Sequence, residues 1–312
     1  MDTRRTSAAE IDHRALVASL PAQTVVALTA KSDLAGLARL AFHWGAILLV
    51  GVLIGARVPL WPILLLPQGI LIVFLFTALH ETSHRTAFAT PWINDLVGRV
   101  CGFAIFLPAE WFRFFHFAHH RHTQDPDHDP ELLAGGKPET VVQYIAHVSG
   151  LPVWWGEAKV LVANATGRCD DTYVPEKARG RIVREARLML AGYAVLAAGS
   201  LLSGSAVLLW VWVLPVLVGQ PFLRLYLLAE HGRCAFVANM LENSRTTLTN
   251  RAVKLIAWNM PFHAEHHSMP SVPFHRLPQL HALMRSHLKV TQQGYARFTR
   301  TYLAGLKGSA SS

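Results

Sequence analysis

Residues 64–84 read "LLLPQGILIVFLFTALHETSH", a mostly apolar run that ends in two histidines, His80 and His84. A helix that spans a bilayer takes about 20 mostly apolar residues, so this stretch predicts a transmembrane helix with a polar end. Its last five residues also match H-E-x-x-H, in which two histidines one helical turn apart bind zinc and the glutamate is the general base of a metalloprotease. Whether His80 and His84 form that site or part of a larger one depends on the rest of the chain.

Composition extends the membrane interpretation to the whole chain. Of the 312 residues, 52% are hydrophobic and 16% are charged, below the roughly 25% charged residues of a soluble domain. Four segments are candidates to cross a bilayer: residues 40–56, 60–79, 188–202 and 206–228. We therefore expect an all-α, polytopic membrane protein.

The distribution of charge predicts the orientation of these spans. The first residues, "MDTRRTSAAEIDHR", lack the apolar segment of a cleavable signal peptide, so we expect them to stay in the cytoplasm. The external turns are then "RVPLWP" and "SGS", in which only Arg57 is charged, and nearly all 29 Lys and Arg lie inside, as the positive-inside rule requires. The expected location is an inner or plasma membrane of the bacterial type, with both termini cytoplasmic.

The net charge of +9 is explained by that rule and by contact with anionic headgroups. No basic helix or aromatic-basic module accompanies the charge, so we expect no nucleic-acid partner. Three cysteines without a CxxC pair fit a reduced setting without disulfides: Cys101, Cys169 and Cys234. Without a repeat of fixed period, one domain is expected over residues 1–312, with cytoplasmic segments at 1–35 and 288–312.

The 17 histidines are clustered. After His80 and His84 come "HFAHHRH" at 116–122 and "HAEHH" at 263–267. Helix positions i, i+3 and i+4 share one face, with Cβ atoms about 5–6 Å apart, so each cluster projects its imidazoles in one direction. The predicted topology, which makes no use of histidine, places all three clusters on the cytoplasmic side, where one polar site could use them together.

Eight imidazoles exceed the four ligands that zinc nearly always takes, which implies two metal ions. His231, in "LLAEHG" at the end of the fourth span, is a candidate ninth ligand, although a histidine at a span end is more often a polar cap. His122 and His128 are expected either to support the ligands or to lie in a solvated loop. His43 is expected to be a satisfied core or interfacial residue. We expect the later histidines on an exposed amphipathic tail: His275, His281 and His287.

The three clusters resemble the three histidine boxes of the membrane fatty acid desaturase superfamily, which also includes hydroxylases and ketolases. "HHRHTQDPDHDPE" is similar to the family's acidic Asp-Pro stretch, and "NMPFHAEHHSMPSVPFHRLPQL" to its N-x-P-x-H-x-x-H-H segment with spaced prolines. The resemblance covers residues 36–285. It implies four transmembrane helices under a cytoplasmic helical cap that holds a non-haem di-iron centre.

Carried over by position, the resemblance implies nine iron ligands: His80, His84, His116, His119, His120, His231, His263, His266 and His267. It also implies O2 as co-substrate, a lipid or fatty-acyl substrate, and, without a fused cytochrome domain in the sequence, a separate electron donor such as ferredoxin or a cytochrome. Four carboxylates are candidates to orient the imidazoles, although exposed or charge-balancing roles are at least as well supported: Glu81, Glu265, Asp125 and Asp129.

Several functions remain open. Oxidation of an unactivated C–H needs a redox metal, and imidazole suits iron whereas zinc has no redox chemistry. A desaturase that introduces a double bond is favoured, and a hydroxylase of a lipid or other apolar molecule is the runner-up, because both share the ligands. An intramembrane zinc protease using "HETSH" would leave the second and third clusters unexplained, and a metal transporter would need ligands inside the spans.

Overall fold

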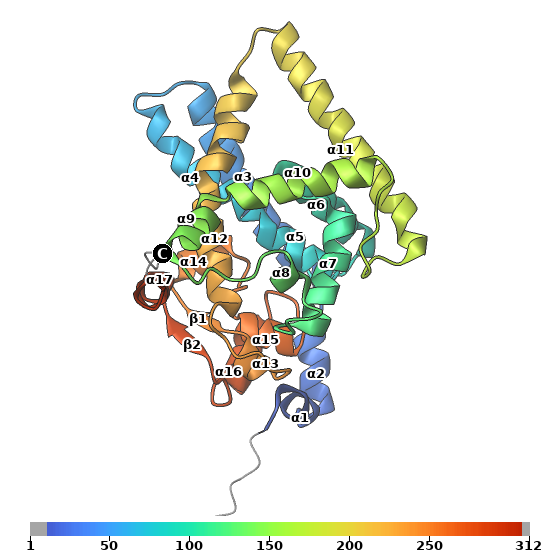
Figure 1. Cartoon of the computed structure of the whole chain (residues 1–312), viewed down its shortest axis with the longest axis vertical. Helices are drawn as coiled ribbons and strands as arrows, with labels where there is room; N and C mark the ends of the chain where they lie inside the picture. Colours follow the sequence, from blue (N-terminus) through green and yellow to red (C-terminus); the bar gives the residue numbers. More distant parts are fainter. Residues whose placement is uncertain (1–10, 308–312) are drawn as a thin grey trace, which may run out of the picture.

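A computed structural model describes residues 11–307, which are mostly helical (Figure 1). In chain order the elements are α1 (His13–Ala18), α2 (Ala22–Thr29), α3 (Asp33–Gly55), the 3-10 helix η1 (Trp61–Leu64), α4 (Leu65–Val73), α5 (Leu75–Ser83), α6 (Pro91–Ala104), α7 (Ala109–His122), α8 (Pro130–Leu133), α9 (Val141–Ser149), α10 (Leu151–Ala165), α11 (Glu176–Leu202), the π-helix η2 (Leu209–Val213), α12 (Leu214–His231), α13 (Met240–Asn243), β1 (Thr246–Leu248), α14 (Arg251–Ile256), α15 (His263–Ser268), α16 (Leu277–Met284), β2 (Thr291–Gln293) and α17 (Tyr295–Ala304).

All four predicted spans coincide, to within three residues at the ends where they overrun, with helices long and apolar enough to cross a membrane: Ala22–Gly55, Trp61–Ser83, Glu176–Leu202 and Leu209–His231. The helices extend past the apolar windows because backbone hydrogen bonding continues into polar sequence that hydropathy does not register. The first span illustrates this, since α3 begins at Asp33, where the Ser32 side chain accepts a hydrogen bond from the Ala35 amide.

The sequence did not predict the pair α6 and α7. Together they pass the same test for a span, but they are bent by 100° at a short break, as in a broken span or a re-entrant loop. The break contains Phe106 in the left-handed region at φ 64° and ends at Pro108, the N-cap of α7, and both features interrupt a helix. The described residues thus hold four candidate spans, or up to five if the bent pair counts as one.

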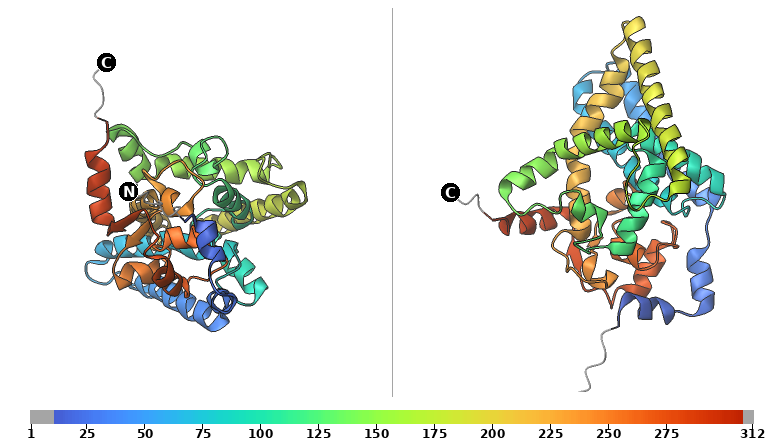
Figure 2. Two further views of the ribbon diagram at one scale, coloured as in Figure 1. Left: turned by 90° about the horizontal axis from the view of Figure 1, so that it is seen from below. Right: turned by 45° about the vertical axis from the view of Figure 1, so that its right-hand side comes forward.

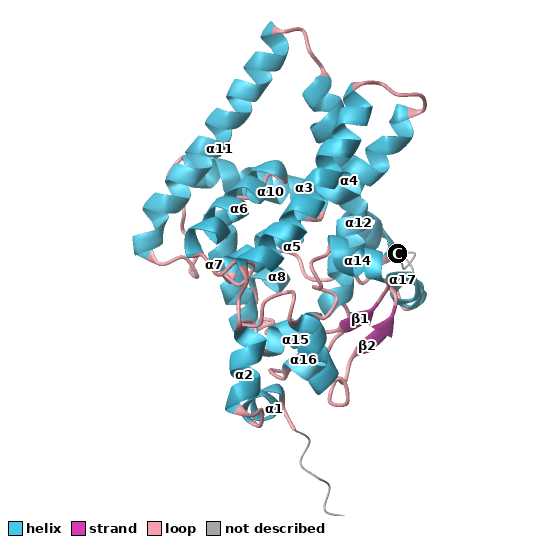
Figure 3. Cartoon of the chain, turned by 180° about the vertical axis from the view of Figure 1, so that it is seen from behind, coloured by secondary structure: helices cyan, strands magenta, loops and turns pink. Residues whose placement is uncertain are grey.

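The spans and the remaining elements occupy opposite ends of the molecule. The turns between α3 and α4 and between α11 and α12 lie together at the top of Figure 1, whereas α13, α15, α16 and the two strands lie below, and Figure 3 shows the same separation from behind. The lower elements form a cap over one end of the bundle. This arrangement places the three histidine clusters at the cap end of the spans.

The predicted tail at 288–312 is largely part of the cap rather than a free extension, and it adds a little strand to the expected all-α fold. β2 pairs in parallel with β1, with Thr291 opposite Thr246. In α17, Phe298 and Tyr302 are buried, and the Tyr302 hydroxyl donates a hydrogen bond of 2.8 Å to the Pro138 carbonyl. Residues 308–312, like residues 1–10 at the other end, lie outside the described part of the chain.

The bundle is tightest where α4 crosses α12. A Cβ atom on Gly69 would lie 2.0 Å from the Pro215 carbonyl oxygen, and one on Gly219 would lie 2.3 Å from the Gly69 carbonyl carbon. Small residues let two helix backbones approach closely, which is how helices in membranes gain packing energy without a hydrophobic driving force. This crossing therefore sets the position of α12, which ends at His231.

Replacing Gly69 with Ala tests this crossing. The added methyl group would meet backbone atoms that cannot rotate away, and overpacking of this kind typically costs about 1–3 kcal/mol. We expect a lower midpoint of heat-induced loss of the monodisperse peak in size-exclusion chromatography. Gly45→Ala in α3 is the matched control, because a Cβ atom there has nothing within 4 Å. An equal loss in both variants would show that the α4–α12 contact does not limit stability.

Candidate metal centre

Nine histidines from four helices meet at the cap end of the bundle. α5 and its C-cap contribute two, α7 contributes three, the last residue of α12 contributes one, and α15 contributes three; Figures 1 and 3 show these helices converging. Two of the nine are half-buried, and the other seven are buried. The set is His80, His84, His116, His119, His120, His231, His263, His266 and His267.

The nine side chains separate into two adjacent groups. In the first, one ring nitrogen from each of five residues lies within 4.8 Å of all the others: His80, His84, His116, His120 and His266. In the second, the same holds for His119, His231 and His267. His263 joins the second group, because its Nε2 lies 2.9 Å from the Nε2 of His231. Each group therefore combines distant parts of the chain around a single point.

The nitrogen–nitrogen separations inside the groups match those of ligands on a shared metal. The Nε2 atoms of His84 and His116 are 2.8 Å apart, and those of His119 and His231 are 3.2 Å apart. Two nitrogens bound at about 2.1 Å to one ion, at right angles to each other, are about 3 Å apart. Two groups with this spacing are able to hold two metal ions.

A comparison with protein families decides the identity. A family model described as fatty acid desaturase matches residues 55–299. The chain belongs to the fatty acid desaturase family. The resemblance inferred from the three histidine boxes is thereby confirmed, and membership of this family together with the four candidate spans makes the chain a membrane protein.

Individual relatives match shorter stretches. An sn-1 acyl-lipid omega-3 desaturase (ferredoxin) of Nostoc sp. (strain 36) is 29% identical over 134 residues, 41% of this chain and 34% of that protein. Fatty acid conjugase FAC2 A of Calendula officinalis is 25% identical over 118 residues, 35% of this chain and 32% of that protein. An sn-1 oleoyl-lipid 12-desaturase of Anabaena variabilis is 32% identical over 82 residues, 24% of this chain and 23% of that protein. The matched stretches thus span about a third or less of each relative's length.

In the second group of this desaturase-family site, the outer ring nitrogens are held by the protein. For three of the four rings Nδ1 has a hydrogen-bond partner that can take its proton, which leaves Nε2 unprotonated toward the centre, the usual way in which metal-binding imidazoles are oriented. The partners are Asp129 Oδ1 for His119 at 3.0 Å, the Asn243 carbonyl for His231 at 3.0 Å and Thr123 Oγ1 for His267 at 3.1 Å. Glu230 Oε1 lies 3.3 Å from the Nδ1 of His263, but no hydrogen bond joins them.

The first group differs in this respect. Neither ring nitrogen of His80, His120 or His266 has a hydrogen-bond partner among the described residues. Buried polar atoms without partners are rare because their desolvation is not compensated, and bound cations would supply the missing interaction. Burial also lowers the pKa of His266 well below the usual imidazole range, as it does for His263 and His267. These rings are neutral, as metal ligation requires, so the residues fit a pair of metal ions.

Of the four carboxylates proposed from the sequence, only Asp129 contacts one of the nine histidines. Glu81 is fully buried and accepts a hydrogen bond of 2.9 Å from the Phe274 amide through Oε1. Glu265 bonds Thr246 and His281. Glu81 therefore connects α5 to the proline-rich segment after α15, and Glu265 connects α15 to β1 and α16, so both support the packing around α15 rather than orient a ring.

The sequence reasoning missed Glu230, Thr123 and Asn243. The sequence position of Glu230 could have identified it, since a carboxylate directly before His231 at the end of an apolar span is unusual. Thr123 follows the second histidine box, but a threonine there has many other uses. Asn243 acts through its backbone carbonyl, which no residue pattern reveals.

Of the predictions for the remaining histidines, one is confirmed and one is wrong. His43 is a satisfied core residue as predicted: its Nε2 lies 2.8 Å from the Leu71 carbonyl, and Trp258 Nε1 donates to its Nδ1 at 3.1 Å. The prediction of an exposed tail was wrong. The His281 side chain is only 21% exposed and bonds Glu265, and His275 and His287 are half-buried too. The cause is that residues 270–287 fold back onto α15 through these polar contacts.

His122 and His128 do not reach the two groups. Their rings are 5.3 Å apart and, with Asp125, they form a separate cluster whose side chains are partly or largely exposed. The interpretation of these residues as solvated loop residues therefore fits better than a supporting role for the ligands.

Replacing Asp129 with Asn tests the orientation of His119. Asn can still cap α8 and accept the Glu131 amide, but it removes the charge beside His119 Nδ1. Loss of such a partner typically lowers metal affinity about 10–100-fold, so less metal per chain should survive dialysis against a chelator. Asp127→Asn is the control, because Asp127 is exposed in the same loop and belongs to none of the groups that could hold a metal ion. Equal retention in both variants would contradict a role for Asp129 in metal binding.

Proposed function

We propose that the chain is an O2-dependent di-iron oxidase that removes hydrogen from an unactivated fatty-acyl chain of a lipid and leaves a double bond. The observation that carries the proposal is the pair of adjacent histidine groups, built from nine side chains at one end of an apolar bundle. The names of the three relatives support it, since two are lipid desaturases and one is a fatty acid conjugase.

The residues proposed to hold the two irons are the nine histidines. Iron bound by imidazoles would supply the O2-derived oxidising power that no side chain has. The chain's own contribution is orientation: Asp129, Thr123 and the Asn243 carbonyl direct ring nitrogens toward the centre. The buried setting excludes bulk water, which protects a reactive oxidant from side reactions.

The zinc protease suggested by "HETSH" is disfavoured by the position of Glu81. A general base has to reach the water that it activates, at about 2.6–3.2 Å. The Glu81 carboxylate instead accepts a hydrogen bond from the Phe274 amide and belongs to neither histidine group. His80 is placed beside His116 and His266, with ring centroids 4.2 Å and 4.6 Å away, so the two histidines of "HETSH" belong to the larger site.

An apolar substrate is supported by the outer surface of the spans. Large apolar side chains on α11 are strongly exposed, among them Leu201 at 82% and Leu202 at 90%, which is expected of surface in contact with lipid. A lipid chain could approach the site from within the bilayer. The electrons would come from a separate donor, a ferredoxin or a cytochrome, docking on the cap, and we place the cap and both termini in the cytoplasm of a cell with a bacterial-type membrane.

The activity prediction uses ligand variants in a host with simple membrane lipids. Wild-type protein should yield a new double bond in the host's acyl chains, detected by mass spectrometry of lipid extracts. His119→Ala and His266→Ala, one from each proposed group, should abolish the product and lower the iron content of purified protein without lowering its expression. His122→Ala, outside both groups, should retain activity within a few-fold.

Two outcomes would count against this proposal. Normal turnover in His119→Ala or His266→Ala would refute the assignment of ligands. A hydroxylated product in place of a double bond would favour the runner-up function, because the two reactions share a ligand set.

The orientation prediction uses single cysteines and a membrane-impermeant thiol reagent. The native Cys101, Cys169 and Cys234 are buried, so their background labelling should be low. Cysteines introduced at the exposed Pro59 and Ser203 should react in intact cells, and one at the exposed Arg285 in the cap should react only after the membrane is opened. The reverse pattern would invert the proposed topology.

A further inference from the structure

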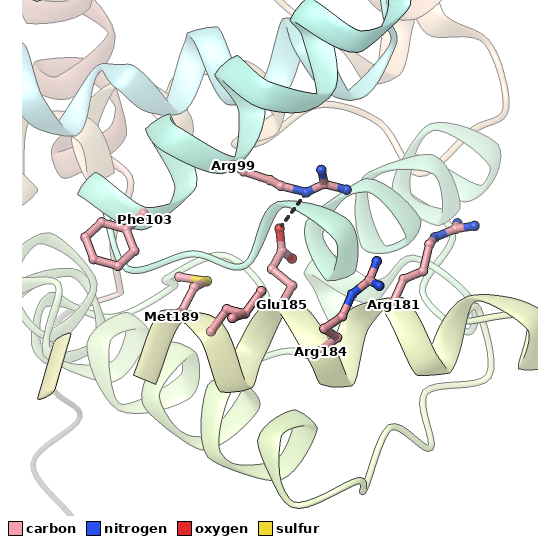
Figure 4. A pocket seen from close by; sticks show the side chains of 7 residues that line it. Arg99, Phe103, Arg181, Arg184, Glu185 and Met189 are labelled. Atoms are coloured by element: carbon pink, nitrogen blue, oxygen red, sulfur yellow. Dashed lines mark ion pairs between the residues drawn. The ribbon is translucent and has the colours of Figure 1, made fainter. Parts of the chain in front are cut away.

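A cleft of about 460 Å³ lies on the side of α11, against α6. Figure 4 shows it lined by arginines at one end and apolar side chains at the other, with Glu185 between them. None of the nine histidines lines it. The lining residues are Arg99, Phe103, Arg181, Arg184, Glu185, Leu188 and Met189.

Two nearly buried carboxylates hold part of the cationic end in place. Glu110 is 2.6 Å from Arg99 and 3.6 Å from Arg181, and Glu185 is 3.7 Å from Arg99. Glu185 also accepts the Glu110 amide at 2.8 Å. Because these carboxylates are themselves fixed by burial and by the backbone, they position the guanidinium groups at the cleft before any ligand arrives, and such preorganisation reduces the entropic cost of binding.

The charges at this end do not cancel. Three arginines line the cleft, whereas Glu185 is the one carboxylate in its lining and Glu110 pairs with Arg99 from beside it, which leaves positive charge in excess. The Arg184 side chain is exposed and makes no hydrogen bond or ion pair within residues 11–307. A guanidinium has five N–H donors in a planar fork suited to a phosphate, so Arg184 has its full donor capacity available for a ligand.

Both walls of the cleft change from cationic to apolar within one helical turn. On α6, Arg99 is followed four residues later by Phe103, and on α11, Arg184 is followed four residues later by Leu188. Residues four apart share a helix face, so the two apolar side chains lie on the same side of the arginines. From residue 188 to the end of α11 the sequence has no charged residue, which marks the level at which the bilayer interior begins.

We propose that this cleft binds the headgroup of an anionic glycerophospholipid. Its phosphodiester would lie between Arg181 and Arg184, and its acyl chain would run along Phe103 and Leu188. The negative phosphodiester would offset excess positive charge, and the change from arginine to apolar side chains follows the chemistry of a headgroup joined to its chain. The lipid would also contact the joint between α6 and α7, because Glu185 bonds the first turn of the helix that carries the second histidine box.

The test is thermal unfolding of the full-length protein in a non-ionic detergent, with phosphatidylglycerol added over a range of concentrations. Native mass spectrometry counts the lipid molecules retained. Phosphatidylglycerol should raise the unfolding midpoint and be retained, whereas an uncharged galactosyl diacylglycerol should do neither. Inorganic phosphate and glycerol 3-phosphate test whether the acyl chain is needed, and stabilisation by either that equals that of the lipid would overturn the proposal.

Three variants separate a built site from general attraction to anionic lipid. Arg184→Gln should weaken phosphatidylglycerol binding about tenfold, because it removes a charge-assisted hydrogen bond to phosphate, and it disturbs no existing contact in the described structure. Leu188→Asn should also weaken it. Arg179→Gln is the control, with the same change in charge on an exposed residue two positions before Arg181, turned away from the cleft by the helical period.

Equal weakening by Arg179→Gln and Arg184→Gln would show that only surface charge matters and would overturn the proposal. Unchanged lipid binding in Arg184→Gln would do the same. Both readouts compare samples with and without lipid and require no turnover, so this experiment can fail while the proposed oxidase function stands, and the reverse is also true.

Discussion

The structure depends on the burial of nine imidazoles at the end of an apolar bundle. Each ring carries two polar nitrogens, and a buried polar atom without a partner costs free energy through lost hydration. The protein meets this requirement in two ways. Around His119, His231 and His267 it provides a carboxylate, a backbone carbonyl or a hydroxyl for the outer nitrogen, whereas around His80, His120 and His266 the described residues provide none.

This asymmetry suggests how the fold and the proposed metal ions depend on each other. The second group is oriented by the protein, so its geometry can exist before a metal binds. The first group relies on neighbouring imidazoles, which repel one another when protonated, so an ion there would contribute to holding α5, α7 and α15 together. The free energy of metal binding would then add to the free energy of folding.

A close helix crossing and a bend between two helices position the residues of this centre. Gly69 and Gly219 let α4 and α12 approach until only hydrogen atoms fit between their backbones, and that contact positions the end of α12 that carries His231. The bend between α6 and α7 turns the second histidine box toward the cap, and Glu185 of α11 bonds the Glu110 amide just beyond the bend. The joint that sets the direction of α7 is therefore also one wall of the proposed lipid cleft.

The sequence by itself determined the features that depend on local pattern. Apolar runs located all four candidate spans, and the i, i+3, i+4 spacing gave the three histidine boxes and the family. It did not determine how the histidines of the boxes are divided between the two groups. Their spacing contains part of the reason, because His116 and His120 are four residues apart and face α5, while His119 is turned by a helical step toward His231.

Only the tertiary structure decided this division, the bend at residues 105–108, the packing of the C-terminal strand and helix into the cap, and the choice of Asp129 over Glu81 as a ring partner. Each of these depends on which distant residues come within hydrogen-bond distance, and hydropathy and helical period describe neighbours along one element rather than contacts between elements.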